Sequence, residues 1–344
     1  MGDAQDRGRL RAGNGAAVYP LHLIPKSPPQ GRSVDEYRAP LFIAWQLTNR
    51  CAGRCIACCE ASGPGNAWPD ELEREEALGL AQRIVQSGIP YVAFGGGEPL
   101  SVAHCWELFD RLTAAGISLK IETDGTRIDD AAADRLAALA VQCVQISVDG
   151  ANRISHERVR PGISFDAATG AIRRLVARGL APQCVFVPTR INLGEMQSVY
   201  DLAASLGCSA FVTGPLMRLG RAADRWDDIA CSAAEWARAE AALRAHVNAR
   251  PTAITLSIYP WDIVTEIERR CESPQAMLLI VPNGKVKLLN ALPFAPADLR
   301  EDSLDEAWRA YCAAWRSAEV RDFAGRCRAE PTLLRHANET WPIS

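Results

Sequence analysis

The sequence predicts an α/β protein in which helices lie outside a parallel sheet. Between residue 41 and about residue 250, six short apolar runs alternate with segments of helical spacing. This alternation is typical of a parallel sheet, because each helix connects two strands and covers the sheet. Six such units can form a partial barrel or a doubly wound sheet. In either case the functional site is expected at the carboxyl ends of the strands.

The strand and helix segments follow one another closely. The predicted strands cover residues 41–47, 91–94, 118–122, 142–148, 183–188 and 209–213. The predicted helices cover residues 70–86, 103–115, 130–139, 165–178, 195–206 and 233–247. Beyond Pro251 we expect a β-hairpin over 277–289, an amphipathic helix over 303–315 and irregular structure over 328–344.

Composition limits both the organisation and the function classes. We expect a flexible leader over 1–38, a core over 39–250 and a small α+β extension over 251–344. The net charge is −3 and there is no basic stripe, so nucleic-acid binding is not expected. No apolar run reaches the roughly 18 residues that span a bilayer, and we find no signal peptide. The sequence therefore predicts a cytoplasmic protein with no membrane partner.

Three clustered cysteines carry the strongest chemical signal. Cys51, Cys55 and Cys58 lie in the loop after the first strand, and a reducing cytoplasm makes such clusters candidates for metal ligands. Three thiolates can hold a [4Fe–4S] cluster and leave one iron open. Zinc is the alternative, but a structural zinc site needs four ligands and the second cysteine pair is missing. A redox pair of Cys55 and Cys58 would leave Cys51 unexplained.

Further motifs stand at the ends of the later strands. They are GGGEP at 95–99, TDG at 123–125, SVDG at 147–150, Val159-Arg160, Ser164-Phe165, and PLMRLGRA at 215–222. With CxxxCxxC, their order and spacing resemble the radical S-adenosylmethionine (SAM) superfamily across residues 41–222. The resemblance is to the branch that contains the PQQ-peptide cyclase and the mycofactocin maturase, whose members carry a C-terminal SPASM or twitch extension.

The resemblance implies a fold and a cofactor site. The fold would be a partial (β/α)6 TIM-like barrel. One [4Fe–4S] cluster would bind Cys51, Cys55 and Cys58, and SAM would chelate the open iron. The SAM contacts implied are Gly96, Gly97, Glu98, Thr123, Ser147, Asp149 and Arg160. No catalytic side chain is identified.

Individual roles follow from the same resemblance. The glycines would let the backbone approach SAM, with Glu98 near its ammonium group. Ser147 and Asp149 would bind the ribose, and Arg160 would bind the SAM carboxylate. Each of these features also has a structural explanation: a strand-to-helix turn, an Asp-Gly turn or a surface charge.

The C-terminal extension departs from the family pattern. SPASM and twitch extensions hold auxiliary clusters through several cysteines, but no cysteine lies between Cys271 and Cys312. Only Cys271, Cys312 and Cys327 remain, and their spacing does not suggest one site. We expect a degenerate extension without an auxiliary cluster. The alternative is a single auxiliary cluster with an unusual fourth ligand.

These features lead to a functional hypothesis. The resemblance implies that a 5′-deoxyadenosyl radical removes hydrogen from the substrate, with a flavodoxin- or ferredoxin-type electron donor. Without an auxiliary electron acceptor, we predict a natural-product enzyme that acts on a small molecule. Decarboxylation of a nucleoside sugar acid, epimerisation and deoxygenation are the candidate reactions. The alternatives are a ribosomal-peptide maturase and a non-catalytic iron–sulfur or zinc protein. Four polar residues near strand ends are candidates to bind an anionic substrate: Arg190, Asn192, Arg218 and Arg221.

Overall fold

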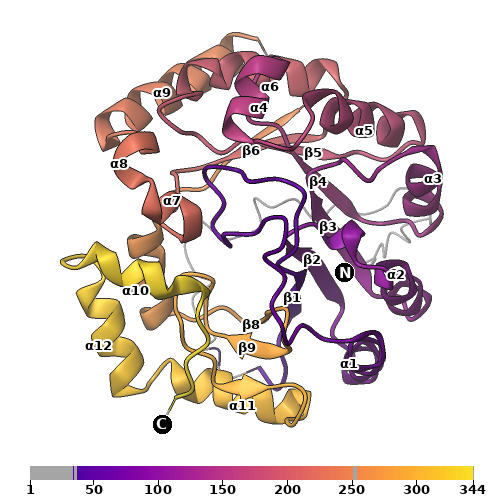
Figure 1. Ribbon diagram of the computed structural model, residues 1–344, viewed down its shortest axis with the longest axis vertical. Helices are drawn as coiled ribbons and strands as arrows, with labels where there is room; N and C mark the ends of the chain where they lie inside the picture. Colours follow the sequence, from indigo (N-terminus) through magenta and orange to yellow (C-terminus); the bar gives the residue numbers. More distant parts are fainter. Residues whose placement is uncertain (1–33, 35–36, 251–253, 344) are drawn as a thin grey trace, which may run out of the picture.

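The computed structural model describes residues 34, 37–250 and 254–343 (Figure 1). Its centre is one sheet in the order β10-β9-β8-β1-β2-β3-β4-β5-β6-β7. The six predicted strands are present as β1 (Phe42–Thr48), β2 (Tyr91–Gly96), β3 (Ser118–Thr123), β4 (Cys143–Ser147), β5 (Gln183–Val185) and β6 (Ala210–Thr213). The leader predicted over 1–38 lies almost entirely outside the described residues.

The strand order distinguishes the two predicted architectures. Strands β1 to β6 are neighbours in chain order and every pair is parallel. A doubly wound sheet would reverse its order at a switch point, whereas successive right-handed crossovers in one direction put all helices on one face. Figure 1 shows these helices around the outside of a curved sheet. The fold is therefore the predicted partial barrel.

The predicted helices surround this barrel with small shifts at their ends. They are α1 (Arg74–Ser87), α2 (Cys105–Ala114), α3 (Asp130–Ala138), α5 (Phe165–Ala177), α6 (Met196–Ser205) and α9 (Ala233–Ala249). Shorter helices lie in the connections: η3 (Pro99–Ser101), α4 (Arg153–Val159), η4 (Leu193–Glu195), α7 (Gly220–Asp224) and α8 (Trp226–Ile229). No helix in the described part of the chain is both long and apolar enough to cross a membrane.

The C-terminal part joins the same sheet at both ends. Strand β7 (Thr255–Ile258) pairs in parallel with β6, and β8 (Met277–Ile280) pairs in parallel with β1. The predicted hairpin is confirmed as β8 and β9 (Lys285–Lys287), and β10 (Ala297–Asp298) follows it. The domain boundary after residue 250 stays a prediction, and β7 lies beyond it in the common sheet.

The extension also contains helices, of which the first after the hairpin packs on β9 and β10. The helix predicted over 303–315 is confirmed as α11 (Leu304–Ala314). The expectation of irregular structure over 328–344 was wrong in part, because Pro331–Asn338 forms the 3-10 helix η5. Two further helices were not predicted, α10 (Ile263–Glu272) and α12 (Ala318–Arg326). Both are short helices, for which periodicity is a weak signal.

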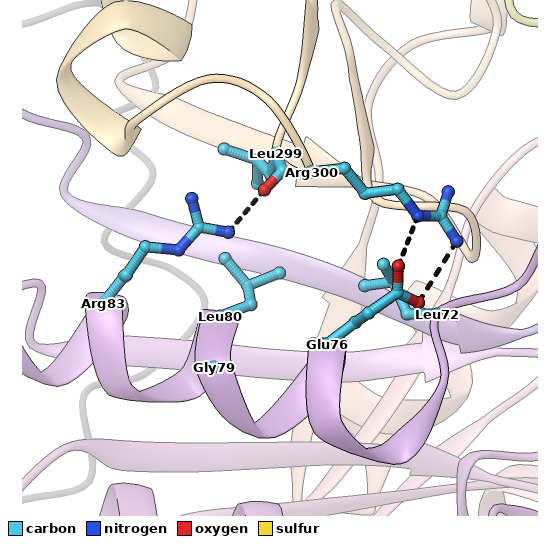
Figure 2. A pocket seen from close by; sticks show the side chains of 7 residues that line it. All are labelled: Leu72, Glu76, Gly79, Leu80, Arg83, Leu299 and Arg300. Carbon is cyan, nitrogen blue, oxygen red and sulfur yellow. Dashed lines mark hydrogen bonds and ion pairs between the residues drawn. The ribbon is translucent and has the colours of Figure 1, made fainter.

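A groove of about 340 Å³ lies between α1 and the turn after β10 (Figure 2). Two arginines bridge its sides. Arg300 pairs with Glu76 at 2.8 Å, and Arg83 donates to the backbone carbonyls of Leu299 and Asp302. Since these guanidinium groups bind the protein itself, we assign the groove a structural role, in which it ties the extension to α1.

Candidate functional site

The cysteine loop lies at the carboxyl end of β1, as predicted. Cys51, Cys55 and Cys58 are all half-buried. The amide of Cys58 donates to the carbonyl of Cys55 at 3.3 Å, which turns the loop back on itself. Burial raises the pKa of Cys55, to which the neighbouring Cys58 thiol adds, while Arg160 opposes the rise. Burial likewise raises the pKa of Cys51 to about 12, and the neighbouring Cys55 thiol adds to this rise.

The donor set suits an iron–sulfur cluster. In the described residues no three His, Cys, Asp or Glu side chains are placed to hold a single metal ion. A [4Fe–4S] cluster makes a different demand, because each cysteine binds its own iron. Three thiols on one loop, with a guanidinium beside the middle one, fit that demand in chemistry and in charge. Cys51, Cys55 and Cys58 are the residues that would hold the cluster.

Backbone carbonyls of the loop are fixed from α7 and from η5. Arg221 donates from Nε to the carbonyl of Cys55 at 2.7 Å, and its amide donates to the carbonyl of Cys58 at 3.0 Å. Its other guanidinium nitrogens donate to the carbonyls of Ala61 and Ser62. The side chain of Asn338 donates to the carbonyl of Cys59 at 3.1 Å. The guanidinium of Arg221 thus holds the loop, and its binding of an anionic substrate stays a prediction.

Replacing Arg221 by methionine should loosen this loop. We expect a loss of about 2–4 kcal/mol of unfolding free energy, because several hydrogen bonds from a charged group to carbonyls disappear. We also expect less iron after reconstitution. Thermal unfolding and iron analysis measure both effects. Arg225→Met on the following turn, whose side chain is 45% exposed, is the matched control. Equal iron content in both variants would contradict the anchoring role.

Gly96 and Gly97 are required by the approach of the cysteine loop. The amide of Gly97 donates to the carbonyl of Thr48 at 2.7 Å. A Cβ at Gly97 would lie 2.1 Å from the carbonyl oxygen of Arg50, and a Cβ at Gly96 would lie 2.5 Å from that of Thr48. Gly96 also has a φ of +111°. The glycines thus serve the contact between two loops, and their approach to SAM stays a prediction.

Glu98 and Thr123 join the ends of β2 and β3. Glu98 accepts hydrogen bonds from the Thr123 hydroxyl at 2.9 Å, from the Asp124 amide at 2.9 Å and from the Leu100 amide at 3.0 Å. It is 2% exposed, and burial raises its pKa to about 8. Both carboxylate oxygens are used inside the protein. Glu98 and Thr123 therefore hold the ends of β2 and β3 together, and their contact with SAM stays a prediction.

Asp149 and Arg160 bind each other. Arg160 Nε donates to Asp149 Oδ2 at 2.5 Å, and the amide of Val187 donates to Asp149 Oδ1 at 2.7 Å. Arg160 Nη1 also donates to Cys55 Sγ at 3.7 Å. Asp149 is only 1% exposed in this arrangement, and its contact with the ribose and that of Arg160 with the SAM carboxylate stay predictions. Asp149 orients Arg160 toward Cys55, while Ser147 is half-buried and its ribose contact also stays a prediction.

The other three candidates to bind an anionic substrate also make contacts within the protein. Asn192 is fully buried and donates to the carbonyls of Asp149 and Val187, each at 3.0 Å. Arg190 donates to the carbonyl of Asp227, and Arg218 stacks over the ring of Trp226. Binding of an anionic substrate by these three residues stays a prediction. No sequence pattern distinguishes an asparagine that supports a strand end from one that contacts a ligand.

The three cysteines of the extension lie on separate elements. Cys271 is in α10, Cys312 is in α11, and Cys327 follows α12. Burial raises the pKa of Cys327, and Cys271 is near enough to add to the rise. The pKa of Cys312 is raised by burial alone. Whether these residues hold a second cluster stays a prediction.

Comparison with known proteins agrees with the motifs. Residues 45–203 match the Radical SAM superfamily. The chain is 35% identical over 206 residues to the mycofactocin maturase MftC of Mycolicibacterium smegmatis, covering 58% of this chain and 52% of that protein. It is 25% identical over 314 residues to the AdoMet-dependent heme synthase of Methanosarcina barkeri, covering 84% and 88%. The chain thus spans about half the length of the mycofactocin maturases that it matches.

Solved structures share the fold at low sequence identity. Streptococcus suis SuiB bound to precursor peptide SuiA has a TM-score of 0.67 at 14% identity, covering 81% of this chain and 67% of that one. Native anSMEcpe with bound AdoMet has a TM-score of 0.61 at 13% identity, covering 82% of each chain. The matched segment 45–203 contains the cysteine motif and every predicted SAM contact. The cysteine loop, the partial barrel and these matches together establish that the chain belongs to the radical SAM superfamily.

Proposed function

We propose that this chain reductively cleaves SAM and uses the resulting radical to remove hydrogen from a small-molecule substrate. The observation that carries the proposal is the arrangement around Cys55. Its thiol accepts a hydrogen bond from Arg160, and its carbonyl accepts one from Arg221. These two hydrogen bonds hold Cys55 in place on the loop that also carries Cys51 and Cys58.

The chemistry divides between the bound groups and the protein. A reduced [4Fe–4S] cluster with SAM on its open iron supplies the 5′-deoxyadenosyl radical. The cysteines hold the cluster, and Arg160 places a positive charge beside a thiolate, which lowers the cost of burying negative charge there. Glu98 and Asp149 keep the strand ends and Arg160 in place. A flavodoxin- or ferredoxin-type protein would donate the electron.

Anaerobic reconstitution tests the proposal. We expect about four irons per chain, and formation of 5′-deoxyadenosine and methionine when dithionite and SAM are added. About eight irons would show instead that the extension binds a second cluster and would restore oxidative reactions as candidates. Iron without SAM cleavage would favour the non-catalytic alternative.

The reaction that we favour is a non-oxidative one on a natural-product intermediate, such as decarboxylation of a nucleoside sugar acid, epimerisation or deoxygenation. The reason is the loss of most auxiliary-cluster cysteines from the extension. The likeness to the heme synthase covers 84% of this chain, so tetrapyrroles belong in the substrate panel. Mass spectrometry of candidate substrates after turnover distinguishes these classes.

A second candidate function is maturation of a ribosomal peptide. It is favoured by the 35% identity to mycofactocin maturases over the barrel. Retention of a short precursor peptide encoded beside this protein in a pull-down would support it. Failure of every neighbouring peptide to bind would argue for the small-molecule reaction.

A further inference from the structure

Asp124 brings a buried carboxylate next to the cysteine loop. It follows β3 directly, in the TDG motif, and is 6% exposed. Its Oδ2 accepts a hydrogen bond from the Cys51 thiol, with 3.9 Å between oxygen and sulfur. A carboxylate is costly to bury unless its oxygens find partners. The contacts of both oxygens therefore indicate what Asp124 does at this position.

The other carboxylate oxygen of Asp124 is held by the turn that follows β3. Asp124 Oδ1 accepts from the Thr126 amide at 2.8 Å and from the Thr126 hydroxyl at 2.5 Å. A carboxylate that binds the amide two residues later forms an Asx turn. The two bonds fix the orientation of the carboxylate, so that Oδ2 stays directed at Cys51.

The negative charge of Asp124 acts on several groups of the site. Burial raises the pKa of Cys51, and Asp124 adds to this rise. Burial also raises the pKa of Cys55, and Asp124 again adds to it. The pKa of Glu98 is raised to about 8 by burial and then by Asp124. Each of these effects has the sign expected of an anion that disfavours further negative charge nearby.

The charge of Asp124 is not neutralised by an ion pair. Arg160 is a cation close enough for Asp124 to affect it, but its Nε already pairs with Asp149 at 2.5 Å. His156 is also affected, but burial lowers its pKa to about 4, so its imidazole is neutral at neutral pH. In the part of the chain that the structure describes, no basic nitrogen lies within 4.0 Å of the Asp124 carboxylate.

We propose that the Asp124 carboxylate lowers the reduction potential of the cluster that Cys51 would help to hold. This inference rests on the proposed function and adds a residue that tunes it. A cysteine that binds iron has lost its proton, so its sulfur could no longer donate to Asp124, and two negative groups would face each other. One-electron reduction adds further negative charge to the cluster, which a fixed carboxylate opposes. A lower potential makes the reduced cluster a stronger electron donor to SAM.

Asp124→Asn removes the charge and preserves the turn. The amide keeps an oxygen for Thr126 and directs an N–H group at Cys51, so the lost charge and the new hydrogen bond to sulfur both favour the reduced cluster. Reconstituted full-length protein without SAM is reduced stepwise with dithionite at measured potentials, and electron paramagnetic resonance gives the reduced fraction. We expect the ratio of reduced to oxidised cluster at a given potential to rise at least about tenfold, which corresponds to a midpoint about 59 mV higher.

Asp129→Asn is the matched control. Asp129 is an exposed residue in the same connection, and its Oδ1 likewise accepts a backbone hydrogen bond, from the Ala132 amide at 2.8 Å. This variant should keep the wild-type potential. Asp124→Ala removes the charge without supplying a donor, so it should raise the potential by less than Asp124→Asn. It also reports the effect of the charge if Asp124→Asn does not hold a cluster.

The outcomes separate this inference from the proposed function. An unchanged or lower potential in the Asp124 variants, or an equal shift in Asp129→Asn, would overturn the inference. Loss of the cluster from both Asp124 variants would also overturn it, because the carboxylate would then be needed to build the site. SAM cleavage by the wild-type protein is measured separately. A wild-type cluster that does not cleave SAM would overturn the proposed function, while the potentials would still decide the role of Asp124.

Discussion

Cys55→Ala should abolish both cluster binding and formation of 5′-deoxyadenosine. Cys55 is the middle cysteine of the proposed ligand triad and the one whose thiol contacts Arg160. A cluster left with two thiolates would have two exposed irons and would not survive reconstitution. Iron content, the absorbance of the reconstituted protein and chromatography of the SAM products measure the effect. We expect the product to fall below detection.

Cys59→Ala is the matched control for this prediction. Cys59 is adjacent to Cys58, but its thiol lies 3.7 Å from Glu60 Oε1, and its pKa is raised by burial. The variant should keep its iron and cleave SAM. Loss of iron in Cys59→Ala together with its retention in Cys55→Ala would show that Cys59, and not Cys55, is a ligand of the cluster.

Gly97→Ala should prevent assembly of the cysteine loop. The added Cβ would lie 2.1 Å from the carbonyl oxygen of Arg50, and that carbonyl also accepts a hydrogen bond from the Glu98 amide at 2.9 Å. The backbone would have to move to relieve this clash. The movement would weaken the two hydrogen bonds between the loops after β1 and β2, from the Gly97 amide to Thr48 and from the Glu98 amide to Arg50. We expect a loss of about 3–5 kcal/mol of unfolding free energy and little bound iron. Chemical unfolding and iron analysis measure both.

Gly79→Ala gives the opposite expectation for the same chemical change. Gly79 lies within α1, and a Cβ there meets no atom within 4 Å (Figure 2). Alanine in a helix is favoured over glycine by about 0.5–1 kcal/mol, so the variant should be slightly more stable and bind normal iron. Similar losses in both variants would show that the contact at Gly97 is not the cause.

The barrel was predictable because each of its strands is a short apolar run that ends in a polar motif. Strand β4 shows the pattern, since Val144 and Ile146 are buried and Ser147 ends the strand. The predicted ends of the helices differ from the observed ends by a few residues. The prediction placed the start of α1 at residue 70, whereas the capping box formed by Glu73 and Glu76 begins the helix at Arg74.

The positions of the site residues were predicted better than their contacts. A strand-end motif indicates that Asp149 lies near the mouth, but its partners Arg160 and Val187 come from segments that the motif does not describe. Glu98 shows the same limit, because its partner Thr123 is on the next strand. Both are buried acceptors, and burial cannot be inferred from a motif alone.

The extension was the least predictable part. Pairing of β8 with β1 joins residues more than two hundred positions apart, such as Phe42 and Met277, and depends on the tertiary structure. Strand β7 has only partly buried or exposed side chains and so lacks an apolar pattern. Helix η5 is fixed by long-range contacts, among them the bond from Asn338 to the loop carbonyl of Cys59.

Electron paramagnetic resonance of the reduced, reconstituted protein tests whether Cys51, Cys55 and Cys58 hold a [4Fe–4S] cluster with one open iron that binds SAM. We predict a signal from a reduced cluster whose shape changes when SAM is added, because SAM occupies that iron. A cluster signal that SAM leaves unchanged, or no signal at all, would contradict it.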